Sequence, residues 1–346
     1  MRKSVLLVGI VAVMLLMMGT ARADLATVDI FTGHVGLSVD AIGSNSSPVG
    51  DVQAYIPSGA TILRAYLYSA GTPYPWYSNS PQTVGNYNGA GITLAGNSIT
   101  NFDTIVGAIS DRADIGRWYT GRADVTSLIS GLATAGPNYS WSISEGSALN
   151  NRIDGEVLVV VYEDPGLPQG SVALLDGGQK TGGETTVVNF VDPLADVTDP
   201  DFFANMSLAI SFSTGDDQHS AIDVNGTRLS TSAGGYDDGG LFDGGLITAG
   251  GIGDSNVNPS DPNSTNRLLD DELYNLVPFL STGDTSFSIF SQNDSNDDNI
   301  FFMGLNIAAE VGSVNPPDGE VPEPATMILL GSGLLGLWGA RKKFRK

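Results

Sequence analysis

Cysteine is absent from the 346-residue sequence, and histidine is nearly absent. Without cysteine, the chain cannot form disulfide bonds, thiolate metal sites or a cysteine nucleophile. The only histidines are His34 and His219, so a histidine-rich zinc site is not expected, and a Ser-His-Asp triad would need one of these two. No G-x-S-x-G nucleophile motif occurs either. The chain must therefore be stabilised by core packing and by any ions that it binds.

Positive charge is scarce between the two ends of the chain. Residues 24–320 hold 8 basic and 37 acidic residues, which gives a net charge of −29. A field of this sign repels phosphate backbones and anionic lipids, so we expect no nucleic-acid partner and no attachment to membranes through a basic surface. Carboxylate pairs for sugar hydrolysis are available in number, but most acids are Asp in turn-rich segments and no spacing singles out a pair.

The N-terminus has the parts of a secretory signal peptide. The basic start Met1-Arg2-Lys3 precedes an almost unbroken apolar run at 5–18, and Ala21-Arg22-Ala23 places small residues where signal peptidase reads them. We therefore expect residues 1–23 to be removed before Asp24. The alternative, a membrane helix that stays in place, is disfavoured because the apolar run is short.

The C-terminal segment 321–346 also has three parts. The motif Val321-Pro322-Glu323-Pro324 is followed by an apolar stretch at 327–340 and a basic cluster at 341–346. The apolar stretch is at the short limit for spanning a bilayer of about 30 Å, and the basic end would face the cytoplasm. Residues 315–320 are expected to link this tail to the body.

This tail resembles a PEP-CTERM sorting signal. The resemblance implies recognition by an exosortase, a membrane transpeptidase of Gram-negative bacteria, and later release or transfer to the cell surface. It also implies an inner-membrane intermediate that is held only by the C-terminal transmembrane helix. Signal peptidase and exosortase are the expected processing partners, and the tail implies nothing about activity.

Residues 24–314 have the pattern of β structure. Twelve segments alternate apolar and polar residues or are rich in β-branched residues, and the gaps are rich in Gly, Asn, Asp, Ser and Pro. The continuous apolar run at 157–161 predicts a strand covered on both faces. The expected strands are 26–31, 35–41, 52–56, 61–68, 92–95, 139–144, 156–162, 171–175, 185–191, 207–212, 285–291 and 300–311.

Only two segments predict helix, at 124–130 with Asp124 as the N-cap and at 266–280. Strands without intervening helices predict an all-β body, an antiparallel β-sandwich or jelly-roll-like fold. The segment 215–262, rich in Asp, Gly and Asn, is expected to form long loops at one end of the sandwich.

Alternation in the segment 61–68 predicts which of its side chains face the core. Ile62 falls on the same face as Tyr66, whereas Leu63 falls with Leu67 on the opposite, core-facing side.

The body resembles a group of exported bacterial β-sandwich proteins of unknown function. The resemblance implies one continuous β unit, and it implies no activity and no catalytic residues. The segments that carry it, in order, are 56–68, 123–128, 155–165, 173–177, 270–279 and 295–299.

Calcium is the cofactor that the composition favours. Carboxylate and amide oxygens suit a hard cation with six to eight ligands, and two clusters supply them. The first has the D-x-N-x-D start of a calcium loop but lacks its later Gly and Glu, and the second lies in a glycine-rich segment without a repeat. Turn formation by the same side chains is the alternative. The clusters are Asp294, Asn296 and Asp298, and Asp237, Asp238 and Asp243.

Aromatic residues in two loop segments could stack on sugar rings. Tyr74, Trp76 and Tyr77 lie in a Pro/Ser/Asn-rich segment, and Trp118-Tyr119 follows an expected turn. Buried anchors beneath long loops have the same sequence pattern, and that interpretation is favoured.

The sequence therefore predicts an exported protein with a structural or adhesive role at the cell surface or in the extracellular matrix. We expect no enzymatic activity. The alternative is a secreted carbohydrate-active protein that binds or hydrolyses glycans, with exopolysaccharide as a partner.

Overall fold

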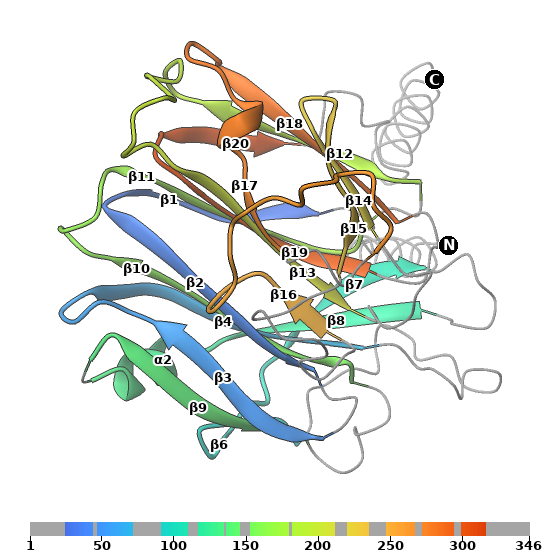
Figure 1. Ribbon diagram of the computed structural model, residues 1–346. Helices are drawn as coiled ribbons and strands as arrows, with labels where there is room; N and C mark the ends of the chain where they lie inside the picture. The colour runs from blue at the N-terminus through green and yellow to red at the C-terminus, as the bar shows by residue number, and fades with distance from the viewer. Residues whose placement is uncertain are drawn as a thin grey trace, which may run out of the picture. The chain divides into compact units, whose positions relative to one another are not determined.

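Antiparallel strands in four sheets make up nearly all of the regular structure that is described (Figure 1). The computed structural model describes residues 25–43, 47–71, 91–109, 117–134, 136–145, 153–179, 182–211, 220–234, 247–266, 272–293 and 299–315. All of them belong to one compact unit, Arg22–Pro316. The all-β antiparallel fold expected from the sequence is confirmed.

The N-terminal part of the chain builds two of the sheets. Sheet B has the order β2-β10-β4-β8-β7, and sheet C has the order β3-β9-β5-β6. Their strands are β2 Val35–Gly43, β3 Val49–Tyr55, β4 Thr61–Gly71, β5 Thr93–Leu94, β6 Asn97–Ser98, β7 Asp103–Ile109, β8 Arg117–Asp124, β9 Asn138–Ser144 and β10 Gly155–Glu163.

The C-terminal part builds the other two sheets, with the first strand β1 added at one edge. Sheet A has the order β1-β11-β19-β13-β16, with β17 also paired to β13, and sheet D has the order β15-β14-β18-β12-β20. Their strands are β1 Ala26–Gly33, β11 Gly170–Asp176, β12 Glu184–Phe190, β13 Ala204–Ser211, β14 Ser220–Val224, β15 Thr227–Ala233, β16 Ile247–Ala249, β17 Leu273–Asn275, β18 Ser286–Asn293, β19 Asn299–Ile307 and β20 Val311–Asn315.

Three hydrophobic cores stack the sheets in the order D, A, B, C (Figure 1). One core joins D to A, a second joins A to B, and a third joins B to C. Strand β10 shows the result: Val157 and Val159 pack toward sheet A, whereas Leu158 and Val160 pack toward sheet C. The interpretation of this apolar run as a strand covered on both faces is confirmed.

A β-bulge in β4 overturns part of the predicted facing of 61–68. The pairing of β4 with β10 shifts between Val161 and Tyr162, so one residue of β4 is extra. As a result Leu63 packs with Tyr66 against the A–B core, and Ile62 packs against the B–C core. The strand is also buried on both faces instead of one.

The two predicted helices have different outcomes. Helix α2 spans Thr126–Leu132, and the Asp124 carboxylate accepts the Thr126 N–H at 2.9 Å, one residue before the N-cap Val125. The prediction at 266–280 is wrong where residues are described, because 273–275 form β17 and Val277–Phe279 form a 3-10 helix. Pairing with β13 buries Tyr274 completely there.

The predicted long loop at 215–262 is also wrong in part, because β14, β15 and β16 lie within it. Strands β14 and β15 form a hairpin. Its turn residues Asn225 and Gly226 both have positive φ, 50° and 73°, as a two-residue type I′ turn requires. The Asn-Gly pair is a strong hairpin signal that composition alone concealed.

The strand ends that lead into the internal segments not described lie at one end of the sheets (Figure 1, right). In sheet B, Gly43 and Ala70 both lie opposite Gly155, and in sheet A Ser211 lies opposite Asn299. Within the part of the chain that the structure covers, no helix is long and apolar enough to cross a membrane. The predicted signal peptide and C-terminal helix lie outside that part.

Candidate functional site

Most residues singled out from the sequence lie outside the described residues. This holds for both predicted calcium clusters, for the sorting motif, for His219 and for the aromatic segment at 74–77. Calcium binding therefore stays a prediction. Among the residues that are described, no group of three or more His, Asp or Glu side chains could hold a metal ion. The ring Nδ1 of His34 contacts the Leu167 carbonyl oxygen at 2.5 Å, which gives this histidine a structural partner.

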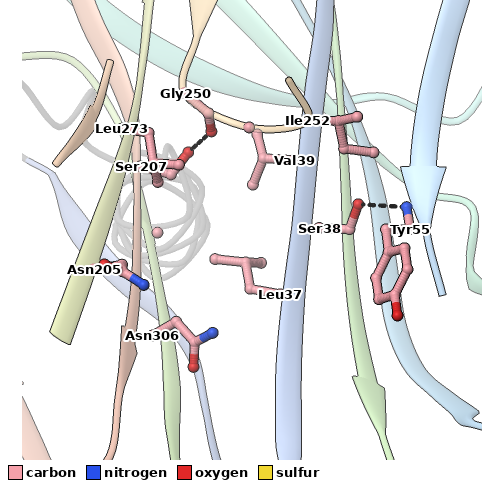
Figure 2. A pocket seen from close by; sticks show the side chains of 12 residues that line it. Leu37, Ser38, Val39, Tyr55, Asn205, Ser207, Gly250, Ile252, Leu273 and Asn306 are labelled. Atoms are coloured by element: carbon pink, nitrogen blue, oxygen red, sulfur yellow. Dashed lines mark hydrogen bonds between the residues drawn. The ribbon is translucent and has the colours of Figure 1, made fainter. Parts of the chain in front are cut away.

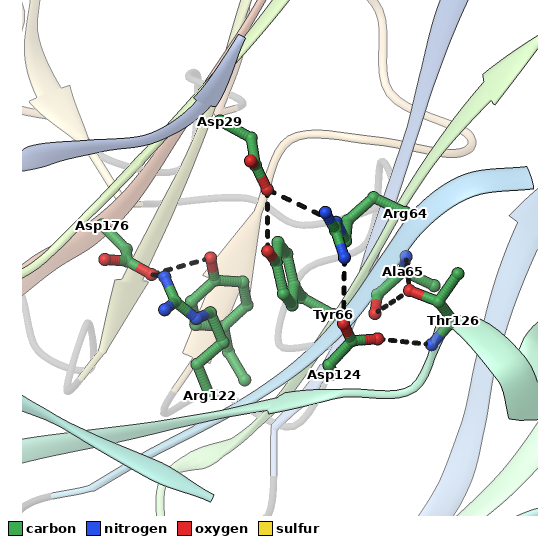
Figure 3. Close-up of polar contacts among 9 residues, drawn as sticks. Asp29, Arg64, Ala65, Tyr66, Arg122, Asp124, Thr126 and Asp176 are labelled. Carbon is green, nitrogen blue, oxygen red and sulfur yellow. Dashed lines mark hydrogen bonds and ion pairs between the residues drawn. The ribbon is translucent and has the colours of Figure 1, made fainter. Parts of the chain in front are cut away.

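The first polar feature of the described body is a network that joins sheet A to sheet B (Figure 3). Asp29 on β1 accepts a hydrogen bond from the Tyr66 hydroxyl at 2.7 Å and lies 3.4 Å from the Arg64 guanidinium, both on β4. Arg64 also donates to Asp124 at 3.1 Å. Because β1 belongs to sheet A and β4 to sheet B, these contacts cross the layer between the sheets.

A second arm of this network crosses the same layer. Arg122 on β8 donates to Asp176 on β11 at 2.5 Å, and the Tyr68 hydroxyl donates to the same carboxylate at 3.0 Å. The Arg122 guanidinium carbon also lies 5.0 Å from the centroid of the Tyr66 ring, within the range of a cation–π contact. The two arms therefore share one tyrosine (Figure 3).

This network, which we call the inter-sheet network, has the chemistry of a structural contact that holds sheets A and B together. Each arginine whose side chain is described, Arg64, Arg122 and Arg228, is ion-paired with an Asp. Burial and the hydrogen bond to Asp29 raise the pKa of Tyr66 to about 12, so its hydroxyl stays protonated and donates to that carboxylate. A protonated, engaged tyrosine is not an activated nucleophile.

A buried carboxyl pair lies at the end of β9 and the start of β10. Glu145 and Glu156 are hydrogen-bonded to each other through their side chains, and Ser69 donates to Glu156 at 3.1 Å. Both glutamates are buried. Burial raises the pKa of Glu156 well above its ordinary value, and the charge of Glu145 raises it further. The protonated form of Glu156 is therefore favoured in the folded protein.

The glutamate pair does not have the spacing of a glycosidase site. Retaining enzymes hold their two carboxyl groups about 5–5.5 Å apart and inverting enzymes hold them farther apart, so that the sugar or a water fits between them. Glu145 and Glu156 are in direct contact instead. The arrangement is that of a protonated pair inside the fold.

One open groove lies beside helix α2. Residues 97–101, the end of β8 and the start of α2 line it, with a volume of about 640 Å³. Arg64 reaches this groove, but Asp29 and Asp124 already neutralise its charge. The groove offers hydroxyl and amide groups and no exposed aromatic ring.

A smaller cleft of about 180 Å³ lies where the edge strand β2 passes over sheet A (Figure 2). We call it the β2 cleft. Sheet A supplies Asn205, Ser207, Gly304 and Asn306, and β3 supplies Tyr55 from the other side of β2. The remaining lining residues are Leu37, Ser38, Val39, Gly250, Gly251, Ile252 and Leu273.

Glycine shapes two walls of the β2 cleft. A side chain at Gly251 would collide with the Val39 carbonyl, and one at Gly250 would collide with the Glu272 carbonyl. A Cβ at Gly304 would lie 2.9 Å from the Leu37 side chain. The backbone of 250–252 therefore passes directly against β2, where the Ile252 N–H donates to Val39 at 3.2 Å.

Sequence reasoning missed these sites because they depend on pairing between distant strands. The inter-sheet network joins residues that are 35 to 108 positions apart in the chain. Asn205 and Asn306 come together only through the register of β13 and β19. The one local signal was Glu156 at the head of the apolar run of β10.

Two family models match the chain. The model described as "Protein of unknown function (DUF3344)" matches residues 18–292. The model described as "PEP-CTERM protein-sorting motif" matches residues 320–346. The first match stops before β19, although the structure places β19 between β11 and β13. No curated protein and no solved structure matches the chain.

Proposed function

Because the chain belongs to the DUF3344 family and carries a PEP-CTERM sorting motif, we propose that it is a non-catalytic structural or adhesive protein of the bacterial cell surface. The sorting motif carries this proposal: it implies export, processing by an exosortase and arrival at the cell surface. The order of events that we propose is removal of residues 1–23, an inner-membrane intermediate held by the C-terminal segment, and cleavage near 321–324 in a Gram-negative envelope.

The body supports a structural role by the way its charges are placed. The arginines whose side chains are described are all paired with carboxylates, and the pair Glu145 and Glu156 is buried. Groups that are engaged in this way stabilise and orient the sheets. Four stacked sheets also give a cysteine-free protein a large apolar interior.

Sorting is tested by changing the motif in the full chain. Pro322→Ala with Glu323→Ala should leave the full-length protein in the inner membrane, whereas Thr326→Ala, just beyond the motif, should be processed like the parent. Fractionation and immunoblotting of cells and medium measure this. Release of the double variant as efficiently as the parent would contradict the proposed route.

A glycan-binding role is the second candidate, and the β2 cleft is the observation that favours it. An adhesive surface protein needs a ligand outside the cell, and this cleft combines free amide groups with an exposed aromatic ring. Attachment of a deletion strain to its matrix should fall and should be restored by the parent chain but not by a chain without 321–346.

A further inference from the structure

The lining of the β2 cleft carries no charged side chain. Its twelve residues are Asn, Ser, Tyr, Gly and aliphatic residues, although residues 24–320 hold 37 acidic residues. A cleft without cations inside a strongly negative protein disfavours an anionic ligand, because nothing offsets the repulsion. A cationic ligand is disfavoured as well, because no carboxylate lines the cleft to pair with it. The electrostatics therefore favour a neutral ligand.

An amide pair supplies the polar contacts. Asn205 and Asn306 lie directly opposite each other on β13 and β19, where side chains of neighbouring strands approach to about 5 Å. The Oδ1 of Asn205 accepts a hydrogen bond from the Asn256 amide at 3.0 Å, so the N–H groups of Asn205 are left to donate to a ligand. The Oδ1 of Asn306 is buried and accepts no hydrogen bond from any described residue.

An adjacent free donor and free acceptor match a hydroxyl-rich ligand. A sugar hydroxyl both donates and accepts, so two neighbouring hydroxyls satisfy both amides at once. An unpaired buried acceptor destabilises the free protein. Its presence in a residue that lines the cleft is accounted for if the Asn306 side chain turns toward a bound ligand that supplies the missing donor.

The edge of β2 adds backbone groups to the same cleft. Val39 accepts the Ile252 N–H on the side away from β10. Backbone groups of a strand alternate in direction, so the N–H and C=O of Leu37, two residues earlier, face the same open edge. They add one donor and one acceptor beside the amide pair.

This edge is too short to bind a peptide as an added strand. Strand addition uses main-chain hydrogen bonds along several residues. Here the Ile252 N–H already bonds to the Val39 carbonyl, and β2 begins only four residues earlier, at Val35. A ligand with scattered hydroxyl groups fits the remaining positions better than an extended backbone does.

Tyr55 completes the site on the far side of β2 (Figure 2). Its side chain is 47% exposed, whereas its backbone N–H is fixed by the Ser38 hydroxyl at 3.0 Å. A held, exposed aromatic ring offers a flat apolar surface to the C–H face of a sugar ring. Tyr55 then contacts the glycan on one side of β2, while the amide pair contacts it on the other side.

We propose that the β2 cleft binds one neutral sugar unit of an extracellular glycan. The volume of about 180 Å³ suits a single ring, because pockets for drug-sized ligands measure about 300–1,000 Å³. This inference rests on the proposed function, since it names the ligand of a surface adhesive protein.

The test is a binding titration with the purified full exported chain. An array of neutral oligosaccharides (glucans, galactans, mannans and N-acetylglucosamine polymers) and matched uronic-acid oligosaccharides identifies the probe, and calorimetry gives its dissociation constant. Methyl glycosides of the same sugars show whether a lone ring suffices. We expect binding to neutral oligosaccharides that changes little with salt.

Variants locate the ligand. Asn306→Leu, close in size to Asn, and Tyr55→Ala should each weaken binding at least about tenfold, the effect of losing one buried hydrogen bond or ring contact. Two matched controls should bind within about twofold of the parent: Val49→Ala, on the exposed face of the same strand as Tyr55, and Asn101→Leu, in the groove beside α2.

Stability separates a binding amide from a structural one. Asn306→Leu removes an unpaired buried acceptor, so its melting temperature should be equal to or above that of the parent while binding is lost. The proposal is overturned if no neutral glycan binds, if only uronic-acid or peptide probes bind, or if Asn306→Leu binds like the parent. Unchanged matrix attachment of the deletion strain, with glycan binding intact in the titration, would instead overturn the adhesive role and leave the site standing.

Discussion

The two halves of the body are built from consecutive stretches of chain and hold their charges differently. Residues 35–163 form sheets B and C, and residues 170–315 form sheets A and D together with β1. At their junction the N-terminal half supplies arginines and tyrosines, and sheet A supplies the aspartates. Between A and D, in contrast, a large hydrophobic cluster forms the core, and the polar contacts that cross it are hydrogen bonds, such as the one from the Val311 N–H to the Ser171 hydroxyl at 2.9 Å.

This difference shows how two sandwiches become one unit without a disulfide. Apolar burial is non-directional and provides most of the stabilisation, but it leaves the relative position of two sheets weakly specified. Ion pairs and hydroxyl donors are directional, so the inter-sheet network fixes which strands of A face which strands of B. The chain itself also links the two halves, because β1 pairs with β11 in sheet A and continues directly into β2 of sheet B.

The largest expected effect comes from removing apolar volume at the junction. Phe302 on β19 is fully buried, and its ring centroid lies 5.4 Å from that of Tyr68 on β4. Phe302→Ala should lower the free energy of unfolding by about 3–5 kcal/mol, because it leaves a cavity between the sheets. Urea denaturation measures this. A cost below about 1 kcal/mol would show that the junction is loosely packed.

A smaller loss should follow from cutting the inter-sheet network. Arg122→Met keeps the length of the side chain but leaves the buried Asp176 carboxylate without its cation. We expect a loss of about 2–3 kcal/mol near neutral pH, the cost of an uncompensated buried charge. Burial already raises the pKa of Asp176, so the loss should shrink in acid, where that carboxyl is protonated.

Arg228→Met is the matched control for this cut. Arg228 pairs with Asp223 inside the β14–β15 hairpin, away from the junction, and both side chains are partly exposed. Its loss should stay below about 1 kcal/mol, as for a surface ion pair. Equal losses for Arg122→Met and Arg228→Met would contradict the idea that the ion pair at the junction of sheets A and B stabilises the protein more than a surface ion pair does.

The smallest effect concerns the carboxyl pair of the N-terminal half and has a pH signature. The raised pKa of Glu156 means that folding favours its protonated form. Its contribution is therefore complete below the ordinary glutamate pKa and is lost as the pH rises toward the folded-state value. Glu156→Gln should remove this slope and raise the free energy of unfolding at pH 8 by about 1–2 kcal/mol.

Thermal melts from pH 4 to pH 8 check the Glu156→Gln prediction. The control is Glu163→Gln, at the exposed far end of the same strand β10, which should keep the profile of the parent. A Glu156→Gln profile parallel to that of the parent would mean that folding does not favour the protonated form of Glu156.

How much the sequence predicts depends on the range of the interactions involved. The doubly buried β10 follows from one apolar run, and the sorting tail is a linear motif, so both are readable locally. The bulge in β4 is not, because it exists only relative to β10. The helix predicted at 266–280 failed because pairing of β17 with β13 overrides local propensity.

The candidate sites were the least predictable feature. Arg122 and Asp176 are 54 residues apart, and Asn205 and Asn306 meet only through strand register. Neither pair lies in a spacing motif, so nothing in the local sequence marks it. The Asn225-Gly226 turn, in contrast, is a local signal. The prediction of a long loop at 215–262 missed it because that prediction rested on composition alone.

Hydrogen exchange in increasing urea, followed by mass spectrometry, tests most directly the claim that the two halves form one unit. The peptides to compare are those of β10 in sheet B and β19 in sheet A, each an interior strand of its sheet. We predict that both lose protection in one transition at the same urea concentration, and that Phe302→Ala shifts both together. Loss of protection in β10 at a lower urea concentration than in β19 would show two independent domains and would contradict this account.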